Sequence, residues 1–194
     1  MRLMKLIAMS LGLPANRFED FFRDHTSSGR INRYPPCPSP EVALGVGPHK
    51  DPGVLTILAQ DEVGGLEVKR KSDGEWVGVK PIKGAYIINL GDVLQVWTNG
   101  EYASVEHRVK VNSVKERYSI PFFLNPSHYT VVEPLEEMTN EEKPAYYRAY
   151  SWGKFQLTRK HSNFTKLQVE TIQINHFKNI TRQHALPDSP TIFG

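Results

Sequence analysis

The sequence predicts a mainly β fold, a sandwich or jelly roll, with flanking helices at both ends. Between about residues 31 and 124, short β-branched and aromatic runs alternate with Gly, Pro, Asn and Asp, the pattern of an antiparallel all-β domain. The 194 residues are enough for one domain with its own core. Apolar residues recur at helical spacing before this span, and helix-start signals follow it.

Seven strands are expected in the central span: 55–58, 66–69, 76–79, 85–89, 93–97, 105–111 and 118–124. Ser72, Asp73 and Gly74 are typical of a hairpin turn between two of them. This number of short strands favours a sandwich or a jelly roll, because double-sheet closure removes exposed sheet edges.

The two ends of the chain predict helices. Four apolar residues of the segment 1–12 have helical spacing and are expected to face the core: Leu3, Leu6, Ile7 and Leu11. A second short helix is expected from Asn16, with Glu19 completing a capping box. A third is expected over 139–161, where Pro144 falls in the first turn. The tail from about Thr181 lacks periodicity and is expected to be loose.

The composition narrows the classes of function. No apolar run approaches the length of a membrane span, so we expect a soluble protein without a membrane partner. The formal net charge is only +3 and the basic residues are dispersed, which argues against nucleic-acid binding. The single cysteine, Cys37, excludes an internal disulfide and fits the reducing cytoplasm. We therefore expect a cytoplasmic monomer that acts on a small molecule.

Three residues form a candidate metal site. His49 and Asp51 stand two apart in an extended segment, so their side chains point to one face, and a jelly roll could bring His107 alongside. Two imidazoles and one carboxylate leave three coordination positions open, the arrangement of non-haem Fe(II) oxygenases, although catalytic zinc sites use the same ligands. Local hydrogen bonding is the simpler explanation of His49 and Asp51 taken alone.

A second candidate site lies at Arg117 and Ser119, which share one face of a predicted strand. A guanidinium beside a hydroxyl is suited to bind a carboxylate through charge-assisted hydrogen bonds. An ordinary cross-strand ion pair is the alternative for Arg117 by itself.

These residues belong to seven motifs that follow one another in order: NRYPPCP at 32–38, GPHKD at 47–51, GGLEV at 64–68, NLGD at 89–92, WTNG at 97–100, HRV at 107–109 and RYS at 117–119. The series resembles the C-terminal oxygenase domain of plant 2-oxoglutarate-dependent dioxygenases, the class that contains flavonol synthase, anthocyanidin synthase and the gibberellin oxidases. The resemblance covers roughly residues 1–165.

The resemblance implies a double-stranded β-helix, or jelly-roll, core that binds Fe(II) through His49, Asp51 and His107. It also implies the activity: a dioxygenase that hydroxylates or desaturates a small apolar metabolite, either a plant specialised metabolite or a hormone. Dioxygen and 2-oxoglutarate would be co-substrates, succinate and carbon dioxide co-products, and ascorbate the reductant.

The same resemblance assigns residues to 2-oxoglutarate and to the substrate. Arg117 and Ser119 would bind the distal carboxylate of 2-oxoglutarate, with assistance from Tyr34 and Asn32. Phe123, on the same strand face, would either contact the organic substrate or pack in the core.

Members of this family carry a further N-terminal region, so residues 1–28 are interpreted as its helical remnant, 29–130 as the oxygenase core and 131–194 as a helical extension with a loose tail. Two alternatives stay open. One is a cupin-like metal-binding jelly roll that uses zinc or manganese without oxidative chemistry. The other is a truncated, catalytically silent relative, for which an exposed apolar face of Leu3, Ile7 and Phe22 is expected.

Overall fold

The computed structural model describes residues 1–164 and 172–179. Its helices are α1 (Arg2–Ser10), α2 (Asp92–Trp97) and α3 (Trp152–Phe164), with 3-10 helices η1 (Glu19–Phe22), η2 (Glu136–Met138) and η3 (Ile174–Phe177). Its strands are β1 (Ser28–Gly29), β2 (Asn32–Tyr34), β3 (Leu44–His49), β4 (Leu55–Gln60), β5 (Leu66–Lys69), β6 (Trp76–Gly78), β7 (Ile87–Leu90), β8 (His107–Lys110), β9 (Arg117–Leu124), β10 (Val131–Val132) and β11 (Tyr150–Ser151).

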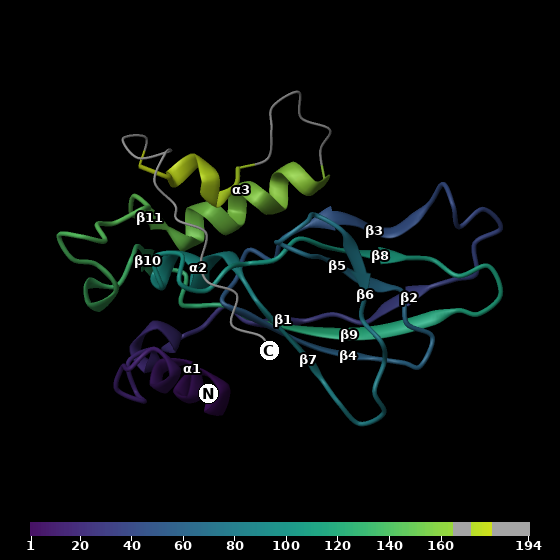
Figure 1. Cartoon of the computed structure of the whole chain (residues 1–194), viewed down its shortest axis with the longest axis horizontal. Coiled ribbons are helices and arrows are strands. Elements are labelled where there is room, and N and C mark those ends of the chain that lie inside the picture. The colour runs from purple at the N-terminus through teal and green to yellow at the C-terminus, as the bar shows by residue number, and fades with distance from the viewer. Residues whose placement is uncertain (165–171, 180–194) are drawn as a thin grey trace.

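Two antiparallel sheets form the main β structure, and β10 and β11 form a separate two-stranded sheet. The five-stranded sheet has the order β1-β9-β4-β7, with β2 also paired to β9, and the four-stranded sheet has the order β3-β8-β5-β6. Figure 1 shows these sheets stacked against each other, with α1 and α3 on opposite sides of α2 near one end. The mainly β jelly-roll prediction is confirmed.

Six of the predicted strands correspond to β4 through β9, but the strand predicted over 93–97 is wrong. That run forms α2, because a short, fully buried apolar segment has the same sequence appearance in a strand and in a helix. The backbone N–H groups of Asp92 and Val93 donate to the carbonyls of Asp51 and Gly53, which turns the chain into a helix at this point. The prediction also missed β3, the strand that ends at His49.

The helix predicted over 139–161 is wrong in its first half, because α3 begins only at Trp152. The buried side chain of Asn99 holds the preceding segment in a non-helical path. Its Nδ2 donates to the carbonyls of Met138 and Pro144, at 3.3 and 3.1 Å, and its Oδ1 accepts from the N–H of Tyr146 at 2.8 Å. These tertiary hydrogen bonds replace those that a helix would make.

The N-terminal segment packs on the core, so the exposed apolar face expected for a silent relative is not present in the described residues 1–22. Phe22 is buried, and Leu3 and Ile7 pack against the main hydrophobic cluster. Two predictions fail here. Leu6 is 61% exposed, and Met4 and Ala8 are the buried residues of α1. The second helix starts at Glu19, without the predicted side-chain cap from Asn16.

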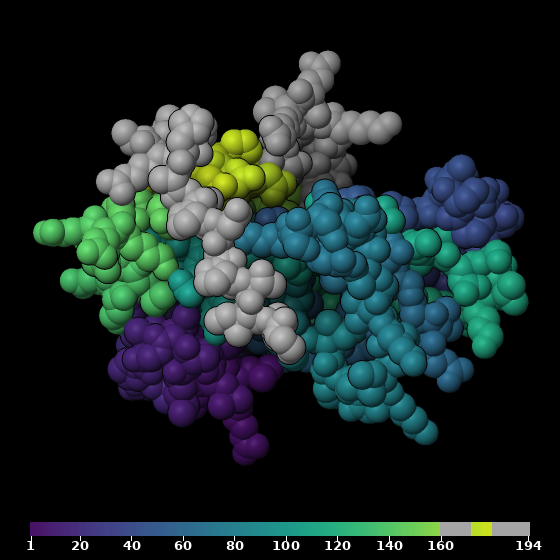
Figure 2. Space-filling model, viewed as in Figure 1, coloured from purple at the N-terminus to yellow at the C-terminus, as the bar shows by residue number. Residues whose placement is uncertain are grey.

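Trp97 of α2 is the centre of this cluster. Its ring lies 5.5 Å from that of Phe18, 4.5 Å from Phe21 and 6.2 Å from Phe22, centroid to centroid. Figure 2 shows the purple N-terminal segment beside the green segment that follows β10, where Arg17 pairs with Glu137. The core thus joins both flanking regions to α2.

None of the helices described has the length and apolar character needed to cross a bilayer. The tail predicted to be loose from Thr181 lies outside the described residues, and the domain boundaries predicted at residues 28 and 130 stay predictions.

Asn99→Ala is expected to lower the free energy of unfolding by about 2 to 4 kcal/mol, because three buried hydrogen bonds are lost together. Urea denaturation measures the change. Asn140→Ala is the control: Asn140 lies in the same segment but is exposed and accepts one hydrogen bond, from Lys143. Equal losses in the two variants would contradict this explanation of the path after η2.

Candidate functional site

The three predicted metal ligands lie together in the structure. His49 at the end of β3 pairs in register with His107 at the start of β8. Asp51 lies two residues after His49 in the chain. The Nε2 atoms of His49 and His107 lie 3.8 and 3.7 Å from Oδ1 of Asp51. One ligand atom from each residue lies within 4.8 Å of the others, and this is the only such cluster found in residues 1–164 and 172–179. The strand register thus produces the convergence that sequence spacing only predicted.

Hydrogen bonds orient each ligand toward the same point. The Nδ1 atoms of His49 and His107 lie 2.8 and 3.3 Å from the carbonyls of Gly47 and Val105, which favours a proton on Nδ1 and a free lone pair on Nε2. Burial, reinforced by the neighbouring His107, lowers the pKa of His49, which favours the neutral ring that a metal requires.

Two hydrogen bonds hold the Asp51 carboxylate, and both are accepted by the same oxygen. Its Oδ2 accepts from Oγ1 of Thr56 at 2.6 Å and from Nδ2 of Asn89 at 2.8 Å. Its Oδ1 is the atom nearest the two imidazoles. This arrangement leaves Oδ1 available to a cation, and the donor set of two imidazoles and one carboxylate oxygen fits Fe(II).

Phe123 lies beside this cluster. Thr56 of β4 pairs with Asn89 of β7 on one side and with Phe123 of β9 on the other, so the three side chains share one sheet face. Phe123 is half-buried, and the guanidinium of Arg30 lies 5.5 Å from its ring centroid. The sheet thus places Phe123 next to the candidate metal site, while its contact with a substrate stays a prediction.

Arg117 and Ser119 occupy the other end of the same face of β9. Their partners in register on β2 are Tyr34 and Asn32, and Nδ2 of Asn32 donates to Oγ of Ser119 at 3.4 Å. All four predicted 2-oxoglutarate residues are therefore neighbours.

The Arg117 guanidinium is almost fully enclosed but only partly paired. The residue is 2% exposed, lies 5.0 Å from the Tyr34 ring centroid and donates from Nη2 to Oε1 of Gln60 at 3.0 Å. Its Nε and Nη1 have no hydrogen-bond partner among the described residues. Burial lowers the pKa of Arg117, with partial compensation from Tyr34 and Asp61. A buried cation with two free donors fits an incoming carboxylate.

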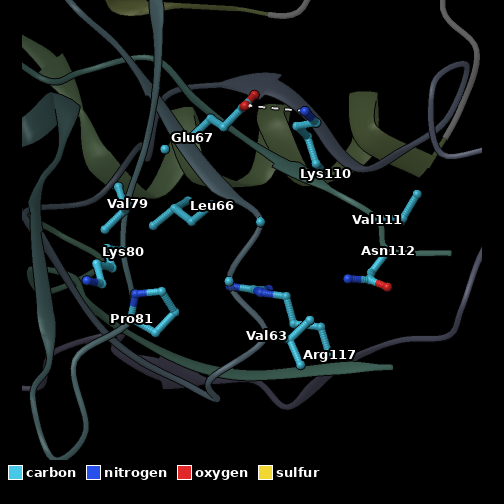
Figure 3. Close-up of a pocket in the computed structure, with 13 residues that line it drawn as sticks. Val63, Leu66, Glu67, Val79, Lys80, Pro81, Lys110, Val111, Asn112 and Arg117 are labelled. Atoms are coloured by element: carbon cyan, nitrogen blue, oxygen red, sulfur yellow. Dashed lines mark ion pairs between the residues drawn. The ribbon is translucent and has the colours of Figure 1, made fainter. Parts of the chain in front are cut away.

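A pocket of about 450 Å³ lies at this end of the β structure. Figure 3 shows Arg117 crossing it, with Lys110 and Asn112 on its wall and Glu67 paired to Lys110. The three candidate metal ligands do not line this pocket. The space therefore belongs to the Arg117 end and leaves room there for a small anion.

Several contributing residues were not predicted from the sequence. Asn89 stands in the NLGD motif, but its contact with Asp51 has no local signal, and Thr56 and Gln60 resemble ordinary strand residues. Their roles depend on which strands become neighbours.

Comparison with known proteins identifies the family. Residues 26–126 match the model of the 2OG-Fe(II) oxygenase superfamily, which is more than half of the chain. The chain belongs to this superfamily. Gibberellin 20 oxidase 3 of Arabidopsis thaliana is 44% identical to this oxygenase chain over 164 residues, covering 83% of it and 43% of the relative. Lateral Branching Oxidoreductase 1 of the same plant is 43% identical, covering 79% and 43%.

Solved structures agree with this assignment. JOX2 in complex with 2OG, Fe and JA matches with a TM-score of 0.76 and 43% identity, covering 80% of this oxygenase chain and 46% of that one. The rice dioxygenase for auxin oxidation matches with a TM-score of 0.73 and 35% identity, covering 83% and 54%. The chain thus spans less than half the length of the curated relatives named above.

Thr56→Val is expected to weaken Mn(II) binding by about tenfold or more, because Asp51 loses its shortest hydrogen bond and its orientation. Isothermal titration calorimetry with Mn(II) under anaerobic conditions measures the affinity. Thr130→Val is the control, since Thr130 is similarly buried and takes no part in the hydrogen bonds that hold Asp51. An unchanged affinity in Thr56→Val would mean that the carboxylate needs no such support.

Proposed function

We propose that this chain is an Fe(II)- and 2-oxoglutarate-dependent dioxygenase domain that hydroxylates or desaturates a small apolar metabolite. The observation that carries the proposal is the pairing of two sites in one β structure. A cluster of two imidazoles and a carboxylate lies at one end, and a buried arginine with two free donors lies at the other. Zinc- or manganese-binding cupin-like proteins have no need of such an arginine.

His49, Asp51 and His107 would hold Fe(II) on one face and leave the opposite positions free. Iron bound there, with 2-oxoglutarate and dioxygen, supplies the oxidising chemistry and yields succinate and carbon dioxide. The backbone carbonyls of Gly47 and Val105 keep the proton of each imidazole on Nδ1.

Arg117 and Ser119 would hold the distal carboxylate of 2-oxoglutarate. The free Nε and Nη1 of Arg117 offer a pair of donors that matches the two oxygens of a carboxylate. Tyr34 supports the guanidinium from its ring face, and Asn32 positions the Ser119 hydroxyl. The carboxylate would thus be bound where water is excluded.

Phe123 would contact the organic substrate beside the metal. The names of related proteins associate them with gibberellin and with auxin oxidation, which supports a plant hormone or a specialised metabolite as the substrate class. Ascorbate as the reductant, a monomeric state and a cytoplasmic location complete the proposal.

The direct test has two parts. Anaerobic addition of Fe(II) and 2-oxoglutarate is expected to produce a weak visible charge-transfer band, and a panel of flavonoids, terpenoid hormones and phenylpropanoids is then screened by succinate release. Metal binding without the band would favour the cupin-like alternative, and a band without turnover would favour the silent relative.

Asp51→Ala is expected to abolish Mn(II) binding and 2-oxoglutarate turnover, because two imidazoles alone leave the charge of the metal uncompensated. Calorimetry and succinate release measure both losses, and circular dichroism checks the fold. Asp73→Ala, in the exposed hairpin, is the control. Full turnover in Asp51→Ala would refute the ligand assignment.

Arg117→Met is expected to weaken 2-oxoglutarate binding by about 2 to 5 kcal/mol without lowering the melting temperature, since the lost cation is buried and only partly paired. Titration of the metal-loaded protein with 2-oxoglutarate measures this change. The neighbouring Arg33→Met is the control, because Arg33 lies on the exposed face and pairs with Glu116. An unchanged titration curve would make Arg117 purely structural.

A further inference from the structure

The side chain of Arg159 in the C-terminal helix α3 reaches the loop that carries the metal ligands. Nη2 of Arg159 donates to the backbone carbonyl of Lys50 at 3.4 Å. Lys50 is the residue between His49 and Asp51, so this contact lies in the middle of the ligand pair. Figure 1 shows α3 lying beside the four-stranded sheet and next to α2.

Arg159 also faces a buried carboxylate. Its Nη1 lies 3.6 Å from Oδ2 of Asp92, and the two side chains are 11% and 0% exposed. Neither carboxylate oxygen of Asp92 has a hydrogen bond of normal geometry within the described residues. Arg159 therefore offsets part of the charge of Asp92, together with the nearby Ser104 and Lys50.

Asp92 is itself attached to the ligand loop. Its backbone N–H donates to the carbonyl of Asp51 at 2.8 Å, and the next N–H, that of Val93, donates to Gly53 at 3.0 Å. Arg159 is thus linked to this loop in two ways. It contacts Lys50 directly, and it contacts Asp92, whose backbone N–H is bonded to the loop. A third contact, from Nη1 to Oε1 of Gln173 at 2.9 Å, connects the same guanidinium to the segment before η3.

From these contacts we infer that Arg159 is a positioning residue for the metal site, through which the docking of α3 sets the affinity for the divalent cation. The inference rests on the proposed function, because it takes His49, Asp51 and His107 as the ligands. Arg159 fixes the Lys50 peptide and Asp92, and these in turn fix the direction of the His49 and Asp51 side chains.

Electrostatics alone would change the affinity for a divalent cation in the opposite direction when Arg159 is lost. The sign of the change therefore separates the two explanations. Loss of the Arg159 cation would leave the site more negative and tighten a divalent cation. Loss of a positioning contact would weaken binding, because the ligands would adopt more orientations in the metal-free protein.

Arg159→Gln is expected to weaken Mn(II) affinity by about ten- to a hundredfold, with partial recovery in Arg159→Lys, which restores the charge opposite Asp92 without the planar fork. Calorimetry on the full chain measures the affinity, and the electron paramagnetic resonance spectrum of bound Mn(II) reports the order of the site. A broader spectrum is expected in Arg159→Gln.

Arg148→Gln is the matched control. Arg148 donates to the carbonyl of His176 in η3, so it helps to dock the C-terminal segment without an ion pair to Asp92. If Arg159→Gln does not fold, the double variant Arg159→Gln/Asp92→Asn removes the buried charge as well, and weak Mn(II) binding by this folded protein would support the inference.

Three results would overturn it: unchanged or tighter Mn(II) binding in folded Arg159→Gln, wild-type binding in the double variant, or an equal loss in Arg148→Gln. In each of them the wild-type chain still binds Mn(II), so the proposed function stands. Absence of Mn(II) binding by the wild-type chain would instead remove the proposed function, and the inference with it.

Discussion

The structure depends on the close contact between the start of α2 and the loop that carries Asp51. A Cβ atom at Gly91 would lie 2.2 Å from the carbonyl oxygen of Gly53 and 3.1 Å from that of Asp51, so only glycine allows this approach. The approach lets three consecutive N–H groups, from Gly91 to Val93, donate to carbonyls of the loop. The backbone around the candidate metal site is therefore fixed by a helix rather than by sheet pairing alone.

The same helix carries the centre of the hydrophobic core. Trp97, at its end, packs against the phenylalanines of the N-terminal segment, and Asn99, two residues further on, holds the segment that leads to α3. The six residues of α2 thus contribute both to the hydrophobic core and to the backbone that positions the candidate metal ligands. Both flanking regions are connected to the site through α2, which explains how residues distant in sequence contribute to its shape.

The two ends of the site differ in how fully their polar groups are hydrogen bonded in the ligand-free protein. At the metal end, the described hydrogen bonds already orient both imidazoles and the carboxylate. At the other end, Arg117 is buried with two donors unpaired, which costs stability in the ligand-free protein. A buried cation with unpaired donors is expected where an anionic ligand supplies the missing hydrogen bonds. The cost in stability is therefore consistent with co-substrate binding.

The sequence by itself determined the strands with clear turn signals, such as β5, and the residues that converge at each end of the site. Alternation along a strand is local, so two-residue spacing was enough to align Arg117 with Ser119 in β9, and the same spacing in an extended segment predicted that His49 and Asp51 converge. Only the tertiary structure decided that 93–97 is a helix and that 139–149 is not, because buried hydrogen bonds to distant carbonyls override local propensity. Contacts between separate elements, such as that of Arg159 with Lys50, have no local signature and exist only once the chain has folded.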